Sequence, residues 1–353
     1  MKVLAVGTYT ERNAPHVTAK QELGEGIYLY FWQEDGRGEE LLHLEKLVNP
    51  SYLEFYGRRM FAVSERENHA VLAEYMLETT GGRINLKRLG GLCLEGAASC
   101  HIELCGETGM LFLSDYGSGD LKVIDVRKGG EPRLLREFYF EGRGVRQDRQ
   151  EASHIHSCCA FEGKLYAADL GGDKIYQFEM GEEGLEGLRT IPARAGAGPR
   201  HMQARQENGV VTLYVINELD CTVSVYQEQD GKGMCEIQWI PLLGQKREKN
   251  MLAADLRLSR DGFLYASVRG SNRIYVLKIE QDGRLCLIQE QENSGEWTRS
   301  ICMDPAQKYL IAANQISGTL TVFERINGRL LGPVRNIRTP VPVKVTVQEV
   351  EES

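Results

Sequence analysis

The 353-residue sequence is informative first for what it lacks. No apolar run approaches the ~18 residues of a membrane-spanning helix, so we expect no transmembrane segment. The nine cysteines are odd in number and never show CxxC spacing, which argues against a disulfide framework and favours buried, reduced thiols. A net charge of −8 provides no basic surface for nucleic-acid phosphates. With 38 glycines and only 10 prolines, the composition favours a turn-rich β protein.

Motifs of familiar catalytic chemistries are absent as well. The chain contains no HExxH, no GxSxG and no P-loop. The glycines of GAGPRH do not make the GxGxxG of a dinucleotide fold, and they precede a strand-like run rather than a helix. We therefore expect no cofactor. The N-terminal MKVLAVGTYTER has neither a secretory apolar core nor a cleavage site, which favours a cytoplasmic protein.

What the sequence does contain is an internal repeat. Six apolar runs, such as LFLSD and LYAAD, end abruptly in a polar residue, and successive ends lie 50, 54, 49, 51 and 45 residues apart. These end residues, called anchors below, are Glu65, Asp115, Asp169, Glu218, Arg269 and Asn314, with Thr8 as a more distant seventh. A second strand-like run, such as LKVIDV or TVSVYQ, belongs to each copy. Four short strands per copy, closed radially, predict an all-β, seven-bladed β-propeller that forms one domain over residues 1–353.

The two ends of the chain predict how the ring closes. The N-terminal copy lacks the inner strand that every other copy places before its apolar run. The C-terminal segment VPVKVTVQEV, residues 341–350, alternates valine with other residues and has no later partner. We therefore expect this segment to pair with residues 4–10 as the inner strand of blade one, so that no sheet edge stays open.

Aligning the copies predicts where a site lies. The inner strands place six residues at one equivalent position: Tyr52, His101, His156, His201, Asp255 and Ser300. In an antiparallel sheet the start of an inner strand lies beside the end of the next strand, so this ring and the anchors meet at one mouth of the central channel. Blades four to six contribute a base, an acid and two guanidinium groups there: His154, His156, Arg200, His201, Glu218 and Arg269. Such groups suit attack on an activated carbonyl beside an anion.

Some polar residues of the repeat have a structural interpretation instead. Propellers join their blades through buried Asp, His and Arg hydrogen bonds, so each ionisable residue alone is as easily structural as functional. Asp115 and Asp169 are followed by glycines and are expected to hold tight turns. His154 and His156 lie two residues apart, but no acidic or cysteine ligand accompanies them at metal spacing, so we expect no metal site.

Several segments in register with the repeat resemble one known family. They are NPSYL, the RQ before SHIHS, DLGGDKIY, GPRHM, LYVINEL, DGFLYASVRGSNRI and AANQISG. Together they resemble the bacterial lactonase family of seven-bladed propellers, which is related to fungal carboxymuconate cyclases, and the resemblance extends from GTYT to the final strand. It implies a hydrolase that opens the ring of 6-phosphoglucono-δ-lactone in the oxidative pentose phosphate pathway without a metal.

The resemblance also implies the site residues. Carried over motif by motif, the catalytic residues are His156, Arg200, Glu218 and Arg269. The alignment of the copies adds His101, His154 and His201 as expected substrate contacts, and Arg299 is a further one. Arg299 lies in TRSI, where the family usually has a Pro-Arg pair, so its role is the least supported.

For lactone hydrolysis, either Glu218 or His156 is expected to take the proton of water, while Arg200 and Arg269 hold the substrate phosphate or the oxyanion. The binding partner is then a small phosphorylated sugar lactone, bound by a monomer or weak homodimer, with no nucleic acid or membrane involved. Two alternatives remain open at this stage. One is a cycloisomerase that uses the same arginines for the carboxylates of a muconate-type diacid. The other is a non-catalytic propeller scaffold, although WD and Kelch motifs are absent.

Overall fold

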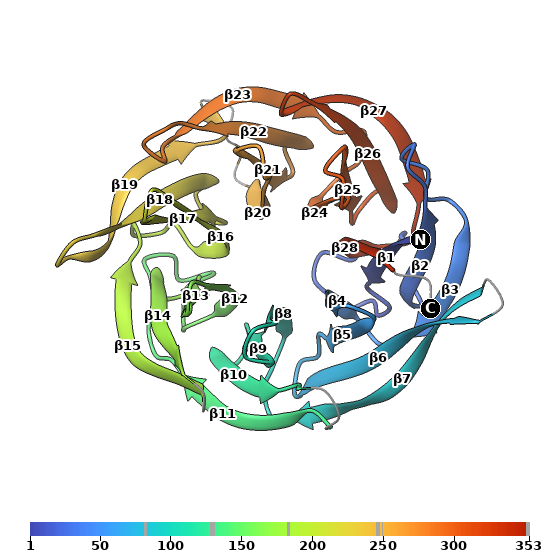
Figure 1. Ribbon diagram of the computed structural model, residues 1–353, viewed down its shortest axis with the longest axis horizontal. Coiled ribbons are helices and arrows are strands. Elements are labelled where there is room, and N and C mark those ends of the chain that lie inside the picture. Colours follow the sequence, from blue (N-terminus) through green and yellow to red (C-terminus); the bar gives the residue numbers. More distant parts are fainter. Residues whose placement is uncertain (81–82, 128–130, 182–183, 245–247, 249, 351–353) are drawn as a thin grey trace.

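A computed structural model describes residues 1–80, 83–127, 131–181, 184–244, 248 and 250–350. These residues form seven four-stranded antiparallel sheets arranged as a ring around a central channel, which confirms the predicted seven-bladed β-propeller (Figure 1). From the innermost to the outermost strand, the blades are β28 (Pro342–Glu349), β1 (Lys2–Thr8), β2 (Gly26–Trp32), β3 (Leu41–Lys46); β4 (Pro50–Tyr56), β5 (Arg59–Ser64), β6 (Ala70–Thr80), β7 (Arg83–Leu94); β8 (Ser99–Cys105), β9 (Met110–Asp115), β10 (Asp120–Asp125), β11 (Arg133–Tyr139); β12 (Ile155–Phe161), β13 (Lys164–Asp169), β14 (Lys174–Gly181), β15 (Gly184–Pro192); β16 (Pro199–Glu207), β17 (Val210–Asn217), β18 (Thr222–Gln229), β19 (Gly233–Pro241); β20 (Leu252–Leu258), β21 (Phe263–Arg269), β22 (Arg273–Ile279), β23 (Leu285–Glu292); and β24 (Thr298–Met303), β25 (Tyr309–Asn314), β26 (Thr319–Ile326), β27 (Arg329–Arg338). No helix in this part of the chain is long and apolar enough to cross a membrane.

The apolar runs of the repeat are continuous because each blade is covered on both faces. The second strand β5 is buried along its whole length. Met60 and Ala62 pack into the core shared with blade one, whereas Phe61 and Val63 pack against blade three. Successive strand residues point to opposite faces, so both faces need apolar side chains. A fully buried residue such as Phe61 contributes about 1.5–3 kcal/mol to folding.

The ring closes as the two chain ends predict. Strand β28 pairs antiparallel with β1, with Val6 opposite Val345 and Lys2 opposite Glu349. The N-terminal ammonium donates a hydrogen bond to the carbonyl oxygen of Val350 at 3.0 Å, which fixes the end of this pairing beside Lys2 and Glu349. The last strand is therefore the inner strand of the first blade.

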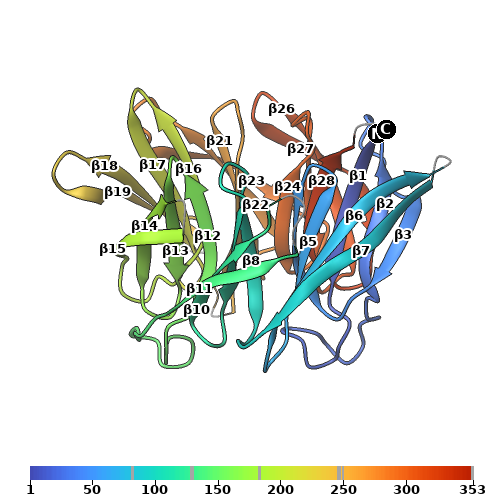
Figure 2. The same cartoon turned by 60° about the horizontal axis from the view of Figure 1, so that its bottom comes forward.

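The two faces of the disc differ. Both termini lie on one face, called the terminal face, and the long loops after β1 and β11 extend from the opposite face, called the loop face (Figure 2). The second strand of each blade ends at the loop face, and the inner strand begins there. The expected meeting of these strand ends therefore occurs around the loop-face mouth of the channel.

The cysteines only partly match the expected burial. All nine thiols are free, and Cys158, Cys159, Cys221 and Cys302 are buried as predicted. The prediction is wrong for two others, Cys93 and Cys286, which are exposed. They lie on the outermost strands β7 and β23, whose one side faces solvent, so the strand pattern alone did not reveal their exposure.

Candidate functional site at the loop face

A repeated β-bulge shapes the loop-face mouth. In all seven blades the register between the inner strand and its neighbour shifts by one residue near the start of the inner strand. In six of these blades the extra residue directly follows the first paired residue of the inner strand; these extra residues are Ser51, Cys100, His156, Arg200, Arg299 and Val343. Bulges re-aim side chains and recur beside active sites. Three ionisable residues of the predicted site are therefore bulge residues.

Glu218 is the centre of the mouth. Its carboxylate, 2% exposed, forms ion pairs with three arginines of different chain segments. Arg149 Nη2 lies 2.6 Å from Oε1, Arg200 Nε 2.9 Å from Oε2 and Arg269 Nη2 2.7 Å from Oε2. Burial alone would raise the pKa of Glu218, but Arg269, Arg149 and Arg200 hold that pKa well below its usual range. The acid is thus a carboxylate at any physiological pH.

The three arginines differ in how many of their N–H donors are used and in how far their side chains are exposed. Arg200 also donates through Nη1 to His201 Nε2 at 3.1 Å and to the carbonyl oxygen of Ala254, so its donors are largely used. Arg269 donates to the carbonyl oxygen of Ala253 at 3.1 Å, but its buried Nε has no hydrogen-bond acceptor among the described residues. The side chain of Arg149 is 30% exposed, against 3% for the other two. Arg269 and Arg149 therefore keep capacity for a ligand.

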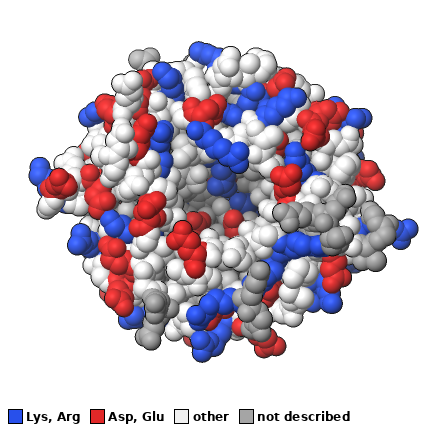
Figure 3. Space-filling view, in the orientation of Figure 1, with Lys and Arg blue, Asp and Glu red and all other residues white. Residues whose placement is uncertain are grey.

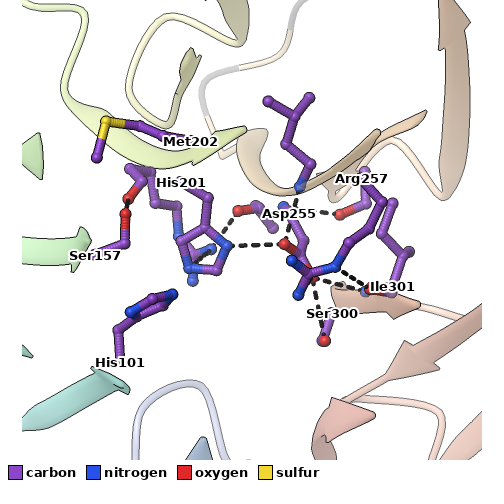
Figure 4. Close-up of polar contacts among 12 residues, drawn as sticks. His101, Ser157, His201, Met202, Asp255, Arg257, Ser300 and Ile301 are labelled. Carbon is purple, nitrogen blue, oxygen red and sulfur yellow. Dashed lines mark hydrogen bonds and ion pairs between the residues drawn. The ribbon is translucent and has the colours of Figure 1, made fainter. Parts of the chain in front are cut away.

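A hydrogen-bond chain from His201 through Asp255 to Ser300 and Ile301 supports Arg200, and Figure 4 shows the contacts of this chain around Asp255. His201 Nδ1 lies 2.8 Å from Asp255 Oδ1, which makes Nδ1 the donor and leaves Nε2 to accept from Arg200. Asp255 is fully buried and also accepts from the Ser300 hydroxyl and the Ile301 amide, at 3.2 and 2.9 Å. This chain joins blades five, six and seven and fixes the guanidinium of Arg200.

A layer of rings closes the channel below the arginines. The ring of His101 lies 4.2 Å from that of Tyr52 and 5.4 Å from that of His201, measured between centroids. These residues belong to blades two, three and five, so the layer spans the channel. Burial lowers the pKa of His101 well below its usual range. His101 and His201, both predicted substrate contacts, thus belong to this ring layer, and His201 contacts Arg200.

His156 is a buried, neutral imidazole next to the cluster. It is 6% exposed, and its ring lies 5.5 Å from those of Tyr116 and His201. Burial and then Arg200 lower the pKa of His156 well below its usual range. The imidazole is therefore unprotonated near pH 7 and able to accept a proton.

His154 supports the opposite wall. Its ring stacks on Tyr116 at 4.3 Å between centroids, Nδ1 lies 2.8 Å from the Tyr116 carbonyl oxygen and Nε2 lies 3.2 Å from Glu151. The Tyr116 hydroxyl in turn accepts from Arg149 Nη2 at 3.3 Å. The structure thus places His154 behind Tyr116, with both of its ring nitrogens in use.

A second ion pair lies on the far side of the mouth. Arg299 Nη2 lies 3.6 Å from Glu65 Oε2, and the Tyr9 hydroxyl donates to the same oxygen at 2.6 Å. The Arg299 guanidinium also covers the Tyr9 ring at 5.2 Å. The structure therefore places the least supported residue of the predicted site at the same mouth as the Glu218 cluster.

Comparison with known proteins identifies the family. A family model described as "Lactonase, 7-bladed beta-propeller" matches residues 3–347. The chain belongs to this lactonase family. It is 29% identical over 337 residues to a 6-phosphogluconolactonase of Formosa agariphila, with 91% of each chain covered. It is 26% identical over 351 residues to a 6-phosphogluconolactonase of Bacillus subtilis, with 96% of each covered. A solved structure named as a periplasmic gluconolactonase of Pseudomonas aeruginosa shares the fold, with a TM-score of 0.88, 24% identity and 99% of each chain covered.

The lactonase structure corrects the alignment of the copies at one inner strand. Ser157, not His156, lies at the position of His101 and His201, because Ser157 pairs with Ala168 as His101 pairs with Ser114. His156 instead matches Arg200 as the bulge residue of its strand. The sequence alignment matched the two histidines by type, and the one-residue bulge is invisible at that level.

The anchors of the lactonase also split into two sets. Each anchor lies at the end of the second strand of its blade, which pairs with the third strand. Asp115, Asp169 and Asn314 are the last residues of the second strand that take part in this pairing. In blade five the last paired residue is Asn217, and Glu218 follows it. Asp115 and Asp169 bond within their own blades, as expected of structural residues. Asp169 accepts from the Gly172 amide at 2.8 Å, which confirms its predicted role in a tight turn.

Sequence reasoning missed Arg149. This residue lies in the loop between β11 and β12, where no strand pattern exists to position it. Gln150 beside it is fully buried and holds the loop by donating to the Leu170 carbonyl oxygen at 2.9 Å. The available signal was the RQ pair before SHIHS, which belongs to the family resemblance. Within the described ranges, no group of three or more His, Cys, Asp or Glu residues is arranged to hold a metal ion.

Proposed function

We propose that the protein hydrolyses the ester bond of 6-phosphoglucono-δ-lactone to give 6-phosphogluconate. Two named relatives carry this activity in their names, and both align over more than nine tenths of the chain. The observation that carries the proposal is the loop-face mouth, where one buried carboxylate orders three arginines beside a neutral imidazole. These are the groups that ester hydrolysis next to a phosphate requires.

His156 is the proposed general base. It takes a proton from the water that attacks the lactone carbonyl carbon, and a tetrahedral oxyanion forms. When the ring carbon–oxygen bond breaks, the imidazolium returns that proton to the departing ring oxygen. The sequence left Glu218 and His156 as equal candidates for this step. The depressed pKa of Glu218 and its three guanidinium partners favour His156 and make Glu218 a positioning residue for the arginines.

The arginines then divide the remaining tasks. Arg269 Nε, the unused buried donor, is the proposed partner of the developing oxyanion. Arg149, the most exposed of the three, is the proposed phosphate contact, since a guanidinium binds phosphate with two parallel hydrogen bonds. Arg200 already contacts Glu218 through Nε and both His201 and Ala254 through Nη1, so it holds the cluster together.

The cellular setting follows from this substrate. The oxidative pentose phosphate pathway supplies 6-phosphoglucono-δ-lactone, and we place the protein there, in the cytoplasm and without nucleic-acid or membrane partners, as a monomer or weak homodimer. One family structure is described as periplasmic, so the location is part of the proposal.

The test is an assay on freshly generated 6-phosphoglucono-δ-lactone, with proton release followed before the lactone opens by itself. The expected result is a protein-dependent rate that is proportional to enzyme concentration and saturates with substrate. Glucono-δ-lactone serves as the matched substrate without phosphate, and its KM should be higher because Arg149 has no anion to bind. A rate equal to spontaneous opening on both lactones would overturn the proposal.

A further inference from the structure

The channel has a second compartment on the other side of the ring layer. Below Tyr52, His101 and His201 lies a cavity of about 270 Å³, to which all seven inner strands contribute. Figure 3 views the terminal face and shows a hollow at its centre, with Lys or Arg side chains inside and Asp or Glu side chains beside it. The cavity, called the terminal-side compartment, has no part in the hydrolysis proposed above. Its volume is close to the lower limit for small-molecule pockets, about 300 Å³.

Lys344 is the unusual cation of this compartment. Alternation along β28 sends Val343 and Val345 into apolar cores and Lys344 into the channel. Lys344 is only 3% exposed, and its Nζ lies 3.6 Å from the centroid of the Tyr52 ring. Among the described residues it has no carboxylate within ion-pair distance and no hydrogen-bond acceptor. Its charge acts on Glu54 in the same cavity, but no carboxylate of the described residues contacts the ammonium group directly, so a bound carboxylate would be favoured there.

Two carboxyl groups face the same cavity on the neighbouring strands. Glu54 on β4 has no hydrogen bond or ion pair within the described ranges. Glu103 on β8 accepts only the Ala160 amide, at 3.0 Å. Burial and then the nearness of Glu54 raise the pKa of Glu103 to about 8. A cation placed between the two carboxyl groups would relieve this repulsion.

Arg257, the other cation of the compartment, is already balanced. Its Nη2 lies 3.3 Å from Asp255 Oδ2, and its Nε donates to the Ile301 carbonyl oxygen at 2.9 Å. The groups without an ion-pair partner among the described residues are thus the Lys344 ammonium and the carboxyl groups of Glu54 and Glu103. A simple anion would satisfy Lys344 but meet Glu54, and a simple cation would satisfy the acids but meet Lys344.

We propose that the terminal-side compartment binds a small zwitterion, with its carboxylate on Lys344 and its ammonium group between Glu54 and Glu103. An unbranched amino acid has this chemistry, satisfies every unpartnered charge of the cavity and leaves the net charge unchanged. The proposal is independent of the lactone reaction, which takes place on the other side of the ring layer.

The test is calorimetric titration with a series of unbranched amino acids from glycine to 6-aminohexanoate. Pentanoate and butylamine are the matched probes that lack one charge each. We expect one length of the series to bind at least tenfold more tightly than either matched probe. Lys344→Met should weaken that binding at least tenfold. Lys308→Met is the matched control, because Lys308 also covers a tyrosine ring, at 5.0 Å, but is exposed on the surface, and it should leave binding unchanged.

The pH dependence gives a second, independent readout through Glu103. The ionisable side chains around Glu103 are Tyr52 and Glu54 of β4, His101 of β8, Cys158 and Cys159 of β12, His201 of β16, Arg257 of β20, Cys302 of β24 and Lys344 of β28. Burial lowers the pKa of the two histidines and raises the pKa of the three thiols, so none of these five titrates near pH 8. Binding of an ammonium group should therefore tighten up to about tenfold from pH 7 to pH 9, as Glu103 ionises. In Glu103→Gln this increase should disappear.

Several results would overturn the proposal. One is the absence of saturable binding of any amino acid of the series to the wild-type protein. Another is an affinity for pentanoate equal to that for the best amino acid, which would indicate a simple anion site. A third is amino-acid binding that weakens from pH 7 to pH 9, which would also indicate a simple anion site. If Lys344→Met does not fold, the comparison of wild type with Glu103→Gln decides, and a pH increase that persists in that variant contradicts the assignment.

Discussion

Asp115 and Glu218 are both buried carboxylates at the loop-face end of the second strand of a blade, yet the clusters around them have opposite charge. Asp115 shares one buried cation, Lys122, with a second carboxylate, Asp120, and also accepts from the Ser99 hydroxyl. Glu218 is one carboxylate shared by three arginines. The first cluster has an excess of negative charge within one blade, and the second has an excess of positive charge at the channel mouth.

The difference arises because the two carboxylates differ by one residue in their position relative to the end of the second strand. Asp115 is the last residue of β9, and its side chain turns into its own blade. Glu218 is the first residue after β17, and its side chain meets arginines from a loop and from the next blade. Because successive strand residues point to opposite sides, a step of one residue exchanges a structural position for a functional one. Only the cluster with excess positive charge can attract a phosphorylated substrate.

Asp115→Asn should have the largest energetic effect and should act on stability alone. An amide at this position loses the charge-assisted hydrogen bonds that Asp115 accepts from Lys122 and Ser99, so the free energy of unfolding should fall by about 3 kcal/mol. Urea unfolding measures this, with Asp125→Asn as control, because the Asp125 pair with exposed Arg127 should contribute less than about 1 kcal/mol. A kcat that falls more than about threefold in folded Asp115→Asn would break the comparison.

Glu218→Gln should act on the reaction. Without the charge that orders Arg200 and Arg269, kcat/KM for 6-phosphoglucono-δ-lactone should fall about 100-fold or more, equivalent to about 2.7 kcal/mol. The protein should remain folded, since Arg149 is partly exposed and solvent anions reach the cluster there. Circular dichroism and initial rates check both statements. Wild-type kinetics on both lactones would remove Glu218 from the site.

Arg269→Ala separates chemistry from recognition. If its Nε holds the oxyanion, kcat should fall by about 10- to 100-fold on both the phosphorylated lactone and glucono-δ-lactone. A rise of KM confined to the phosphorylated substrate would instead assign Arg269 to the phosphate.

Arg149→Ala should show the converse pattern, with a smaller effect. KM for 6-phosphoglucono-δ-lactone should rise about fivefold to tenfold, because one charge-assisted contact is lost, while glucono-δ-lactone is little affected. Steady-state kinetics on the two lactones measure the split. Equal losses on both would mean that Arg149 acts only by holding Glu218.

The pH profile of the wild-type enzyme should show the smallest change. Burial and Arg200 lower the pKa of His156 well below its usual range, so the base stays unprotonated on the acid side of neutrality. The kcat should therefore change less than twofold between pH 7.5 and pH 6, whereas an unperturbed histidine of pKa about 6.5 would lose most of its base form there. A kcat that follows a pKa near 6.5 would contradict the neutral, buried imidazole.

The sequence predicted the parts of this protein that depend on periodicity. The spacing of the apolar runs indicated seven blades, and the unpaired alternation at the C-terminus indicated the closing strand, because both patterns extend over many residues. The convergence of Arg200, Glu218 and Arg269 also followed from the repeat. Periodicity defines which strand ends meet, and the structure brings these three side chains within hydrogen-bond distance.

The features that the sequence did not predict depend on single residues. The bulge that aligns His156 with Arg200 shifts the register by one residue, and nothing in residue type marks it. Arg149 comes from an irregular loop held by a buried glutamine. Lys344, Glu54 and Glu103 lie on three inner strands, at positions whose side chains point into the channel. Which of them lack an ion-pair partner depends on distances across the channel.

The most direct test of the loop-face site is a crystal structure of the protein with 6-phosphogluconate bound. We predict that the product lies above the Tyr52, His101 and His201 layer, with a carboxylate oxygen about 2.7–3.1 Å from Arg269 Nε and the phosphate at Arg149. The His156 ring should contact the same carboxylate. Product bound only in the terminal-side compartment, or at the loop face without contact to Arg269 and His156, would contradict the central claim.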